Sequence, residues 1–388
     1  MSESATPRTV RELGEFALIE RINRRRVQAP GVLLGPGDDA ALVAAPDGRF
    51  VVTTDMLVQD RHFRLDWSSP ADIGRKAIAQ NAADVVAMGA APSAFVVALG
   101  LPSDTPLEVV DGLADGMWAE AARAGASIAG GDLVRSREIV ISVTAFGDLN
   151  GRAPVPRAGA RVGDTVAVAG RLGWSAAGLA ALTAGVDSAE FAEVLAAHRV
   201  PQPPYTAVLD VLSTKDTAAQ PHNDVAPHPR DDAASHSHDD VAAHPHNDAA
   251  PPPRDDAAAH PPNNTANPAT PCPNSLTDVS DGLLADLGHI AESSGVSIDL
   301  DSAALRDPAL ERIAGALDAD AAQWILTGGE DHAFAGTWPA GRPLPPGWVP
   351  IGRVCAGHGV TVDGVPRSGS AGWESFGGAD SASPGEPR

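Results

Sequence analysis

Several residue types and patterns are scarce in this chain of 388 residues, and each absence excludes a class of protein. The two cysteines, Cys272 and Cys355, stand far apart without Cys-X-X-Cys spacing, which argues against a disulfide scaffold and a thiolate zinc site. No apolar run is long enough to span a bilayer, and residues 1–10 lack the apolar core of a signal peptide. The formal net charge of -22 argues against a nucleic-acid-binding surface. We therefore expect a cytoplasmic enzyme that binds neither membranes nor nucleic acid.

The phosphate-binding motifs of common kinases are also missing. There is no GxxxxGK[ST] loop, and the chain has only two lysines, Lys76 and Lys215. Neither a His-Arg-Asp nor an Asp-Phe-Gly motif occurs. If the chain uses ATP, its architecture must differ from those of P-loop proteins and protein kinases.

Alternating strand and helix patterns predict a mixed α+β and α/β protein of two domains. Residues 50–147 follow a strand, helix, strand, helix, turn, strand order, which indicates an N-terminal sheet-and-helix domain over 1–150. Residues 151–388 are predicted to form a second α/β domain. The helices expected near the N-terminus cover Glu12–Ile22 and Pro70–Gly89, while Ala129–Leu133 is interpreted as a Gly-Gly-Asp turn.

Residues 213–274 differ from the rest of the chain. Asn-Asp, Asp-Asp and Asn-Asn pairs recur there every eight residues, separated by Ala, Pro and His, with almost no large apolar residue. Such a segment cannot build a core, so we predict a disordered low-complexity insertion. Seven of the twelve histidines lie here. A weak metal-binding tail remains an alternative to a neutral spacer, which we favour.

Short acidic runs recur at predicted turns, strand ends and one helix face. They are Asp38-Asp39, Thr53-Thr54-Asp55, Asp84, Gly131-Asp132 and Asp278-Val279-Ser280-Asp281. Each run alone fits a solvated turn or an ordinary cap. Many carboxylates and hydroxyls without a His/Cys cluster favour hard cations, Mg²⁺ above all, and several Mg²⁺ ions indicate a polyphosphate ligand.

The run from Thr277 to Gly288 is the most informative of these. Asp278 and Ser280 alternate, so on a strand both would share one face. Asp281 is expected to be the N-cap of a helix whose apolar positions include Leu283 and Leu287. Polar groups at the positive end of a helix are suited to hold phosphate oxygens and their cations.

Taken together, these runs resemble the thiamine-monophosphate kinase family, in the superfamily of aminoimidazole ribonucleotide synthetase and selenophosphate synthetase. The matching runs are Gly14–Phe16, Gly35–Ala40, Thr53–Asp55 with His62-Phe63, Asn81–Ala90, Gly130–Asp132, Asp278–Gly288, Gly328–Asp331 and Gly372-Trp373. They occur in order from residue 14 to about residue 376. The insertion at 213–274 has no counterpart in the family pattern, and His332 stands where the family often has Tyr.

The resemblance implies ATP-dependent phosphorylation of thiamine monophosphate to thiamine diphosphate by a homodimer whose N-terminal sheets pair. The implied Mg²⁺ ligands are Asp39, Thr53, Thr54, Asp55, Asp84, Asp132, Asp278 and Asp281. Gly131, Asp132, Arg157 and Ser280 would meet ATP, and His62, Glu330 and Trp373 would meet thiamine monophosphate. The Trp373 ring face would attract the cationic thiazolium. No protein nucleophile or general base is implied, because the attacking phosphate oxygen is already largely ionised.

Two alternatives remain at this point. One is a related ATP-using synthetase that activates a carbonyl oxygen, against which Trp373 and the turn at Glu330 count. The other is a non-catalytic metal-binding protein built on the acidic turns and the His-rich repeat. The ordered recurrence of acidic turns along the whole chain makes this second alternative the weaker one.

Overall fold

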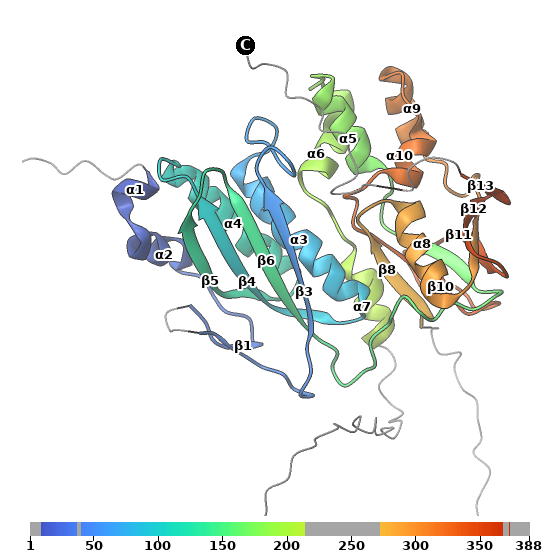
Figure 1. Cartoon of the computed structure of the whole chain (residues 1–388), viewed down its shortest axis with the longest axis horizontal. Coiled ribbons are helices and arrows are strands. Elements are labelled where there is room, and N and C mark those ends of the chain that lie inside the picture. The colour runs from blue at the N-terminus through green and yellow to red at the C-terminus, as the bar shows by residue number, and fades with distance from the viewer. Residues whose placement is uncertain (1–8, 37–39, 214–271, 368–371, 373–388) are drawn as a thin grey trace, which may run out of the picture. The chain divides into compact units, whose positions relative to one another are not determined.

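A four-stranded sheet with two long helices against one face forms the N-terminal half (Figure 1). The computed structural model describes residues 9–36, 40–213, 272–367 and 372. The strand order is β3-β6-β4-β5, with β4 and β5 parallel and the other pairs antiparallel. The elements are β3 (Val51–Val58), α3 (Pro70–Ala87), β4 (Ala91–Leu101), α4 (Leu107–Arg123), β5 (Ser127–Arg135) and β6 (Val140–Asp148). They are preceded by α1 (Val10–Leu13), α2 (Glu15–Asn23), β1 (Val32–Leu34) and β2 (Leu42–Val43).

A seven-stranded sheet forms the C-terminal half, in the order β13-β12-β9-β11-β7-β10-β8. Its strand pairs are antiparallel except β9 with β12. The strands are β7 (Thr165–Ala169), β8 (Ser275–Val279), β9 (Ser297–Leu300), β10 (Ala333–Trp338), β11 (Val349–Cys355), β12 (Gly359–Val362) and β13 (Val365–Pro366). The helices are α5 (Trp174–Thr183), α6 (Ala192–Arg199), α7 (Tyr205–Ser213), α8 (Leu283–Ser294), α9 (Pro308–Ala316) and α10 (Ala321–Thr327), with a short 3-10 helix at Ala189–Phe191. The mixed α/β fold class is confirmed.

Helix α3 lies between the two sheets. It begins as the sequence predicts, because Ser69 caps it through a capping box with Asp72 and Pro70 occupies its first turn. One buried apolar cluster runs from Ile141 of β6 through Ile78 of α3 to Phe334 of β10. Side chains on α3 can therefore reach residues that come much later in the chain.

The predicted division into domains 1–150 and 151–388 stays a prediction. The four-stranded sheet ends at Asp148 and the seven-stranded sheet begins at Thr165, on either side of that boundary. The described residues of both halves nevertheless belong to one compact unit. The shared helix α3 and its continuous core account for this unity.

Two local expectations in the N-terminal half were wrong. The predicted turn at Ala129–Leu133 is the middle of β5, where a Cβ on Gly131 would meet the Val97 carbonyl oxygen at 1.9 Å. Glycine is therefore required there by the close approach of β4 rather than by a chain reversal. The helix expected over Glu12–Ile22 is two helices, because Gly14 adopts a φ of 82° and separates α1 from α2.

The predicted disordered insertion at 213–274 lies outside the described residues except at its two ends. Ser213 is the last residue of α7. Asn274 donates from its backbone to the Thr337 carbonyl at 2.7 Å and from its side chain to Asp164 Oδ2 at 2.9 Å. The insertion was therefore predicted to end too late. Among the described helices, none combines the length and apolar character needed to cross a membrane.

Candidate active site

Carboxylates from three elements converge beside helix α3. Along β3 the side chains alternate, so Thr53 and Asp55 face α3 while Thr54 faces away. Thr53 Oγ1 donates to Asp84 Oδ2 of α3 at 2.9 Å. Asp278, nearly fully buried on β8, lies within electrostatic reach of both Asp55 and Asp84. The structure thus gathers four of the eight residues predicted to hold Mg²⁺.

The gathered acids destabilise one another's ionised forms. Burial, followed by the charges of Asp278 and Asp55, raises the pKa of Asp84 to about 7. Burial is also the main reason why the pKa of Asp55 is raised, and Asp278 adds to that shift. A cation that binds between these carboxylates would reduce their mutual repulsion and stabilise their ionised forms.

This electrostatic arrangement predicts the pH dependence of stability without metal. Because the pKa of Asp84 rises from 3.8 to about 7 on folding, the folded state binds more protons than the unfolded state between these values. Asp84 therefore lowers stability progressively as pH rises through this range. In EDTA, Asp84→Asn should match the wild-type melting temperature near pH 4 and exceed it by a few degrees at pH 8.

A control of opposite sign is available on β9. Hydrogen bonds from Thr361 and the Gly364 backbone lower the pKa of Asp299, so its ionised form stabilises the fold as pH rises. Asp299→Asn should lose melting temperature at pH 8 rather than gain it. An Asp84→Asn difference that does not change between pH 4 and pH 8 would contradict the predicted repulsion.

Two amides of α3 hold Asp55 in place, and sequence reasoning did not assign them this role. Asn81 Oδ1 accepts the backbone N–H of Asp55 at 3.0 Å, and its own amide nitrogen donates to the Ala77 carbonyl. Gln80 Nε2 donates to Asp55 Oδ2 at 3.2 Å. Asn81, Gln80 and Asp84 therefore bind β3 to one face of α3 at the acidic cluster.

His332 occupies the position where the family pattern often has Tyr, and it contacts the acidic cluster directly. Its Nδ1 lies 3.1 Å from Asp278 Oδ2, and its backbone N–H donates to the Val279 carbonyl. Burial alone would lower the pKa of His332, but the Asp278 carboxylate, helped by Asp84 and Glu330, outweighs burial and raises it. The imidazole therefore orients the Asp278 carboxylate.

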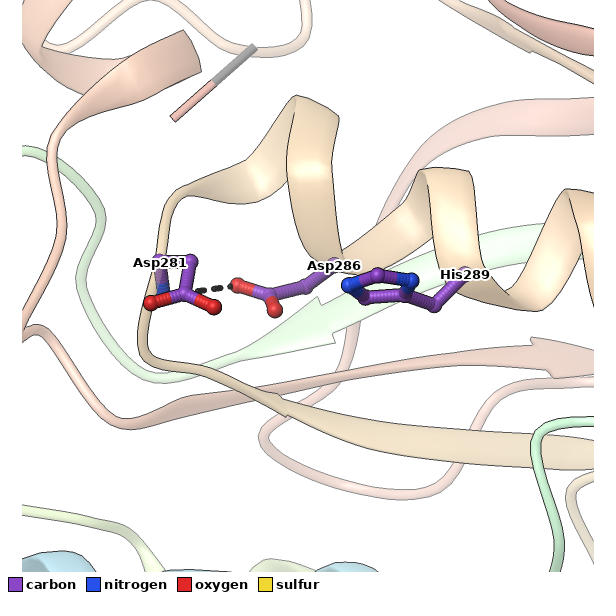
Figure 2. A group of neighbouring side chains, drawn as sticks. All are labelled: Asp281, Asp286 and His289. Atoms are coloured by element: carbon purple, nitrogen blue, oxygen red, sulfur yellow. Dashed lines mark hydrogen bonds between the residues drawn. The ribbon is translucent and has the colours of Figure 1, made fainter. Parts of the chain in front are cut away.

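The turn after β8 is built differently from the expected cap. Helix α8 begins at Leu283 with Gly282 as its N-cap, so Asp281 is not the cap residue. Gly282 has a φ of 129°, a conformation that side chains disfavour. Asp286 Oδ2 accepts three backbone N–H groups, from Ser280, Asp281 and Gly282, each at 3.1 Å. Figure 2 shows the bond from Asp281. Asp286 thus locks the turn from inside the helix.

Asp281 and its neighbours form a second group of possible cation ligands next to the first. One atom each of Asp281, Asp286 and His289 lie within 4.8 Å of one another, and Figure 2 shows Asp286 between the other two. Burial, followed by the Asp278 charge, raises the pKa of Asp281, while Arg157 and His289 counteract that shift. Arg157 therefore acts on this corner of the site electrostatically.

A cleft of about 1840 Å³ is lined by several of these residues. Asp55, Asp84, Ser280 and Asp281 line it together with His62 and Glu330, two of the residues predicted to contact thiamine monophosphate. Trp67 and Trp324 supply aromatic surface to the same cleft. Asp39, a predicted Mg²⁺ ligand, and Trp373, a predicted contact of thiamine monophosphate, lie outside the described residues.

Two predicted Mg²⁺ ligands, Thr54 and Asp132, face the other side of the four-stranded sheet. Thr54 Oγ1 donates to the Val143 carbonyl of β6, which keeps this hydroxyl away from Asp84. Gly131 and Asp132 lie on the exposed part of β5, where the side chain of Asp132 shares the outer face with that of Thr54. The sheet itself separates Thr54 and Asp132 from the acidic cluster.

The comparison with known proteins first places the chain in a class. Residues 37–149 match the family model of the AIR synthase related protein, N-terminal domain. This region contains β3, α3 and the three strands that complete the four-stranded sheet. The match therefore covers the whole four-stranded sheet and both of its long helices.

Full-length relatives then identify the family. The chain is 50% identical over 96% of its length, and 94% of the relative's, to the thiamine-monophosphate kinase of Mycobacterium tuberculosis. It is similar to the crystal structure of thiamine-monophosphate kinase from Stenotrophomonas maltophilia K279a, with a TM-score of 0.67 and 30% identity, covering 91% of this chain and 97% of that one. A structure of AaThiL complexed with AMPPCP and TMP gives a TM-score of 0.65 and 26% identity over 96% of this chain and all of that one. The chain belongs to the thiamine-monophosphate kinase family.

Proposed function

We propose that the cleft transfers the terminal phosphoryl group of ATP to thiamine monophosphate, giving thiamine diphosphate for thiamine cofactor biosynthesis. The observation that carries this proposal is that Asp55 and Asp84, whose carboxylates lie near that of buried Asp278, line the cleft that also contains His62 and Glu330. One end of the cleft is suited to a cation-bound polyphosphate and the other to a small polar substrate. Membership of the family supports the same reaction.

The donor set of the acidic cluster fits Mg²⁺. Buried carboxylates and a hydroxyl supply only oxygen, the donor that Mg²⁺ prefers, and the raised pKa of Asp84 shows that the cluster gains from a positive charge. We propose Asp55, Asp84 and Asp281, which line the cleft, and Thr53 and Asp278 beside them as the ligands. Asp39 outside the described residues, and Thr54 and Asp132 on the outer face, stay predicted ligands. When bound, Mg²⁺ neutralises charge on the transferred phosphoryl group.

The chain's own residues bind and orient both substrates. Ser280 and Arg157 flank Asp281 and are proposed to meet the nucleotide, together with the predicted Gly131 and Asp132. His62 and Glu330 are proposed to hold thiamine monophosphate, with Trp373 as its stacking wall. Because the substrate's phosphate is already ionised at neutral pH, no side chain needs to remove a proton. Alignment of the two phosphates would supply catalysis together with the neutralisation of their charge.

The direct test is incubation with ATP, Mg²⁺ and thiamine monophosphate, with the product identified by mass. The expected product is thiamine monophosphate plus one phosphoryl group, formed with one ADP per turnover. ATP consumption that depends on a carbonyl substrate instead would favour the related synthetase. Cation binding without any ATP-dependent product would favour a non-catalytic metal-binding protein.

We also propose that the outer face of the four-stranded sheet pairs with that of a second copy. Val52, Met56 and Val134 are each more than half exposed on this face. Met56→Asp should shift the protein from dimer to monomer in sedimentation equilibrium, because a carboxylate would be buried without a partner. Val349→Asp, equally exposed on β11, should leave the mass unchanged. A monomeric wild type would contradict the pairing.

We also propose that the protein is located in the cytoplasm.

A further inference from the structure

Lys76 is a buried lysine that the reaction described above leaves without a role. It lies on α3 with 2% of its surface exposed, and it is the one lysine among the described residues. Burial of an ammonium group is costly unless the group is paired and hydrogen-bonded. Its Nζ donates to the His62 carbonyl at 3.0 Å and pairs with Glu330 Oε1 at 2.9 Å. Lys76 therefore connects both described residues that are proposed to hold thiamine monophosphate.

The Glu330 side of this connection is an ionised carboxylate in a fixed position. Burial would raise the pKa of Glu330, but the charge of Lys76 and its hydrogen bond outweigh burial and lower it. Glu330 has a φ of 64°, and its backbone N–H donates to the Ser280 carbonyl at 2.7 Å. Lys76 thus pairs with the side chain of a residue whose backbone is hydrogen-bonded to Ser280, in the turn between β8 and α8.

The second oxygen of Glu330 is left available to the cleft. Oε2 lies 3.8 Å from His198 Nδ1, which is beyond a normal hydrogen bond. Burial, together with the nearby Lys76 charge, lowers the pKa of His198 to about 4, so this ring is neutral. His198 Nδ1 instead lies 3.2 Å from Ser175 Oγ. Glu330 Oε2 can therefore accept a hydrogen bond from a bound substrate.

The His62 side of the connection is fixed as a donor. His62 Nδ1 accepts the backbone N–H of Val58 at 3.0 Å, so Nδ1 carries no proton and the neutral ring carries it on Nε2. The same residue's carbonyl accepts from Lys76. The loop between β3 and α3 is therefore held at both its ring and its backbone.

We propose that Lys76 is a positioning residue that sets the spacing between the His62 donor and the Glu330 acceptor for the thiamine part of the substrate. This inference rests on the proposed function. Lys76 acts through its two partners and does not itself contact the reacting phosphates. Its removal should therefore weaken the use of thiamine monophosphate while leaving the use of ATP intact.

The test is a comparison of Lys76→Met with Arg75→Met in steady-state kinetics. Lys76→Met should raise KM for thiamine monophosphate about tenfold or more, while KM for ATP should change less than about twofold. The reason is that Glu330 loses its charge-assisted hydrogen bond to Lys76, and Glu330 is proposed to contact thiamine monophosphate only. Arg75, the next residue on α3, pairs with buried Glu120, which keeps Arg123 and Tyr205 as partners. Arg75→Met should leave both KM values unchanged.

A double-variant cycle separates positioning from a general loss of structure. In the Glu330→Gln background, Lys76→Met should raise KM for thiamine monophosphate much less than in the wild type, since one of its two partners is already altered. Lys76→Met/Glu330→Gln carries no unpaired buried charge and replaces the single variant if that one fails to fold. Equal effects in both backgrounds, or a parallel rise in KM for ATP, would overturn the inference.

The same assay distinguishes this inference from the proposed function. If the wild type makes no thiamine diphosphate, the proposed function fails and the role of Lys76 falls with it. If the wild type makes thiamine diphosphate and Lys76→Met retains both wild-type KM values, only the role of Lys76 is refuted.

Discussion

Asp55→Asn and Asp278→Asn should each lower the rate of thiamine diphosphate formation by about 10²-fold or more. Each substitution removes a carboxylate that is proposed to hold the cation beside the transferred phosphoryl group. Without ligand, Asp55→Asn should not melt below the wild type, since it relieves repulsion with Asp84. Asp278→Asn relieves the same repulsion but weakens the contact with His332, so its melting temperature should change little. Calorimetry should show that both variants lose the stabilisation that Mg²⁺ and ATP together give the wild type.

Asp299→Asn serves as the matched control for these two variants. Asp299 is a carboxylate on β9 that does not line the cleft, so its removal should leave turnover and the response to Mg²⁺ and ATP unchanged. Near wild-type turnover by either cluster variant at limiting Mg²⁺ would show that its carboxylate is not a ligand. The assignment of the acidic cluster as the cation site would then have to be abandoned.

Asp286→Ala should cause the largest loss of stability among the single substitutions considered. Asp286 Oδ2 is the acceptor for three backbone N–H groups of the turn before α8. Leaving them without this acceptor should lower the free energy of unfolding by about 3 kcal/mol, measured by denaturant titration. The same change should reduce activity, because the turn carries Ser280 and Asp281.

Asp286→Asn separates the acceptor from the charge. Burial, followed by the charges of Asp278 and Asp281, raises the pKa of Asp286 to about 7, so a neutral amide removes an unfavourable charge while it keeps one acceptor oxygen. Asp286→Asn should therefore be much more stable than Asp286→Ala. If both variants unfold at the same denaturant concentration as the wild type, Asp286 does not lock the turn.

Local signals in the sequence were sufficient for much of the fold. The Ser69 cap and Pro70 predict the start of α3, and the β-branched run of β3 predicts a strand with Thr53 and Asp55 on one face. The prediction of a turn at the Gly-Gly-Asp run was wrong because glycine occurs both in turns and where two strands approach closely. Only the position of Val97 on the neighbouring strand distinguishes these two cases.

The candidate site could be predicted in part, for a related reason. The acidic runs of the cleft were found from their chemistry, because unpaired carboxylates near apolar segments are conspicuous. The partners that position them were not, since Lys76 reaches Glu330 and His332 reaches Asp278 only after distant segments pack together. No spacing along the chain predicts such a pair. Thr54 was predicted as a Mg²⁺ ligand together with its neighbour Asp55. Adjacent residues on a strand face opposite sides, so the Thr54 hydroxyl points away from the acidic cluster.

The position of α3 between the two sheets also determines how the chain can fold. The strands of the first sheet precede β8 and β10, so the face of α3 that meets those later strands stays uncovered until they form. The intervening segment adds little to the entropy cost of loop closure, which grows only with the logarithm of length, but contacts so distant in sequence form slowly. Lys76 and Asp84 thus gain Glu330 and Asp278 as neighbours only when the C-terminal strands pack against α3. A chain truncated before residue 270 would complete neither the cation end nor the substrate end of the cleft.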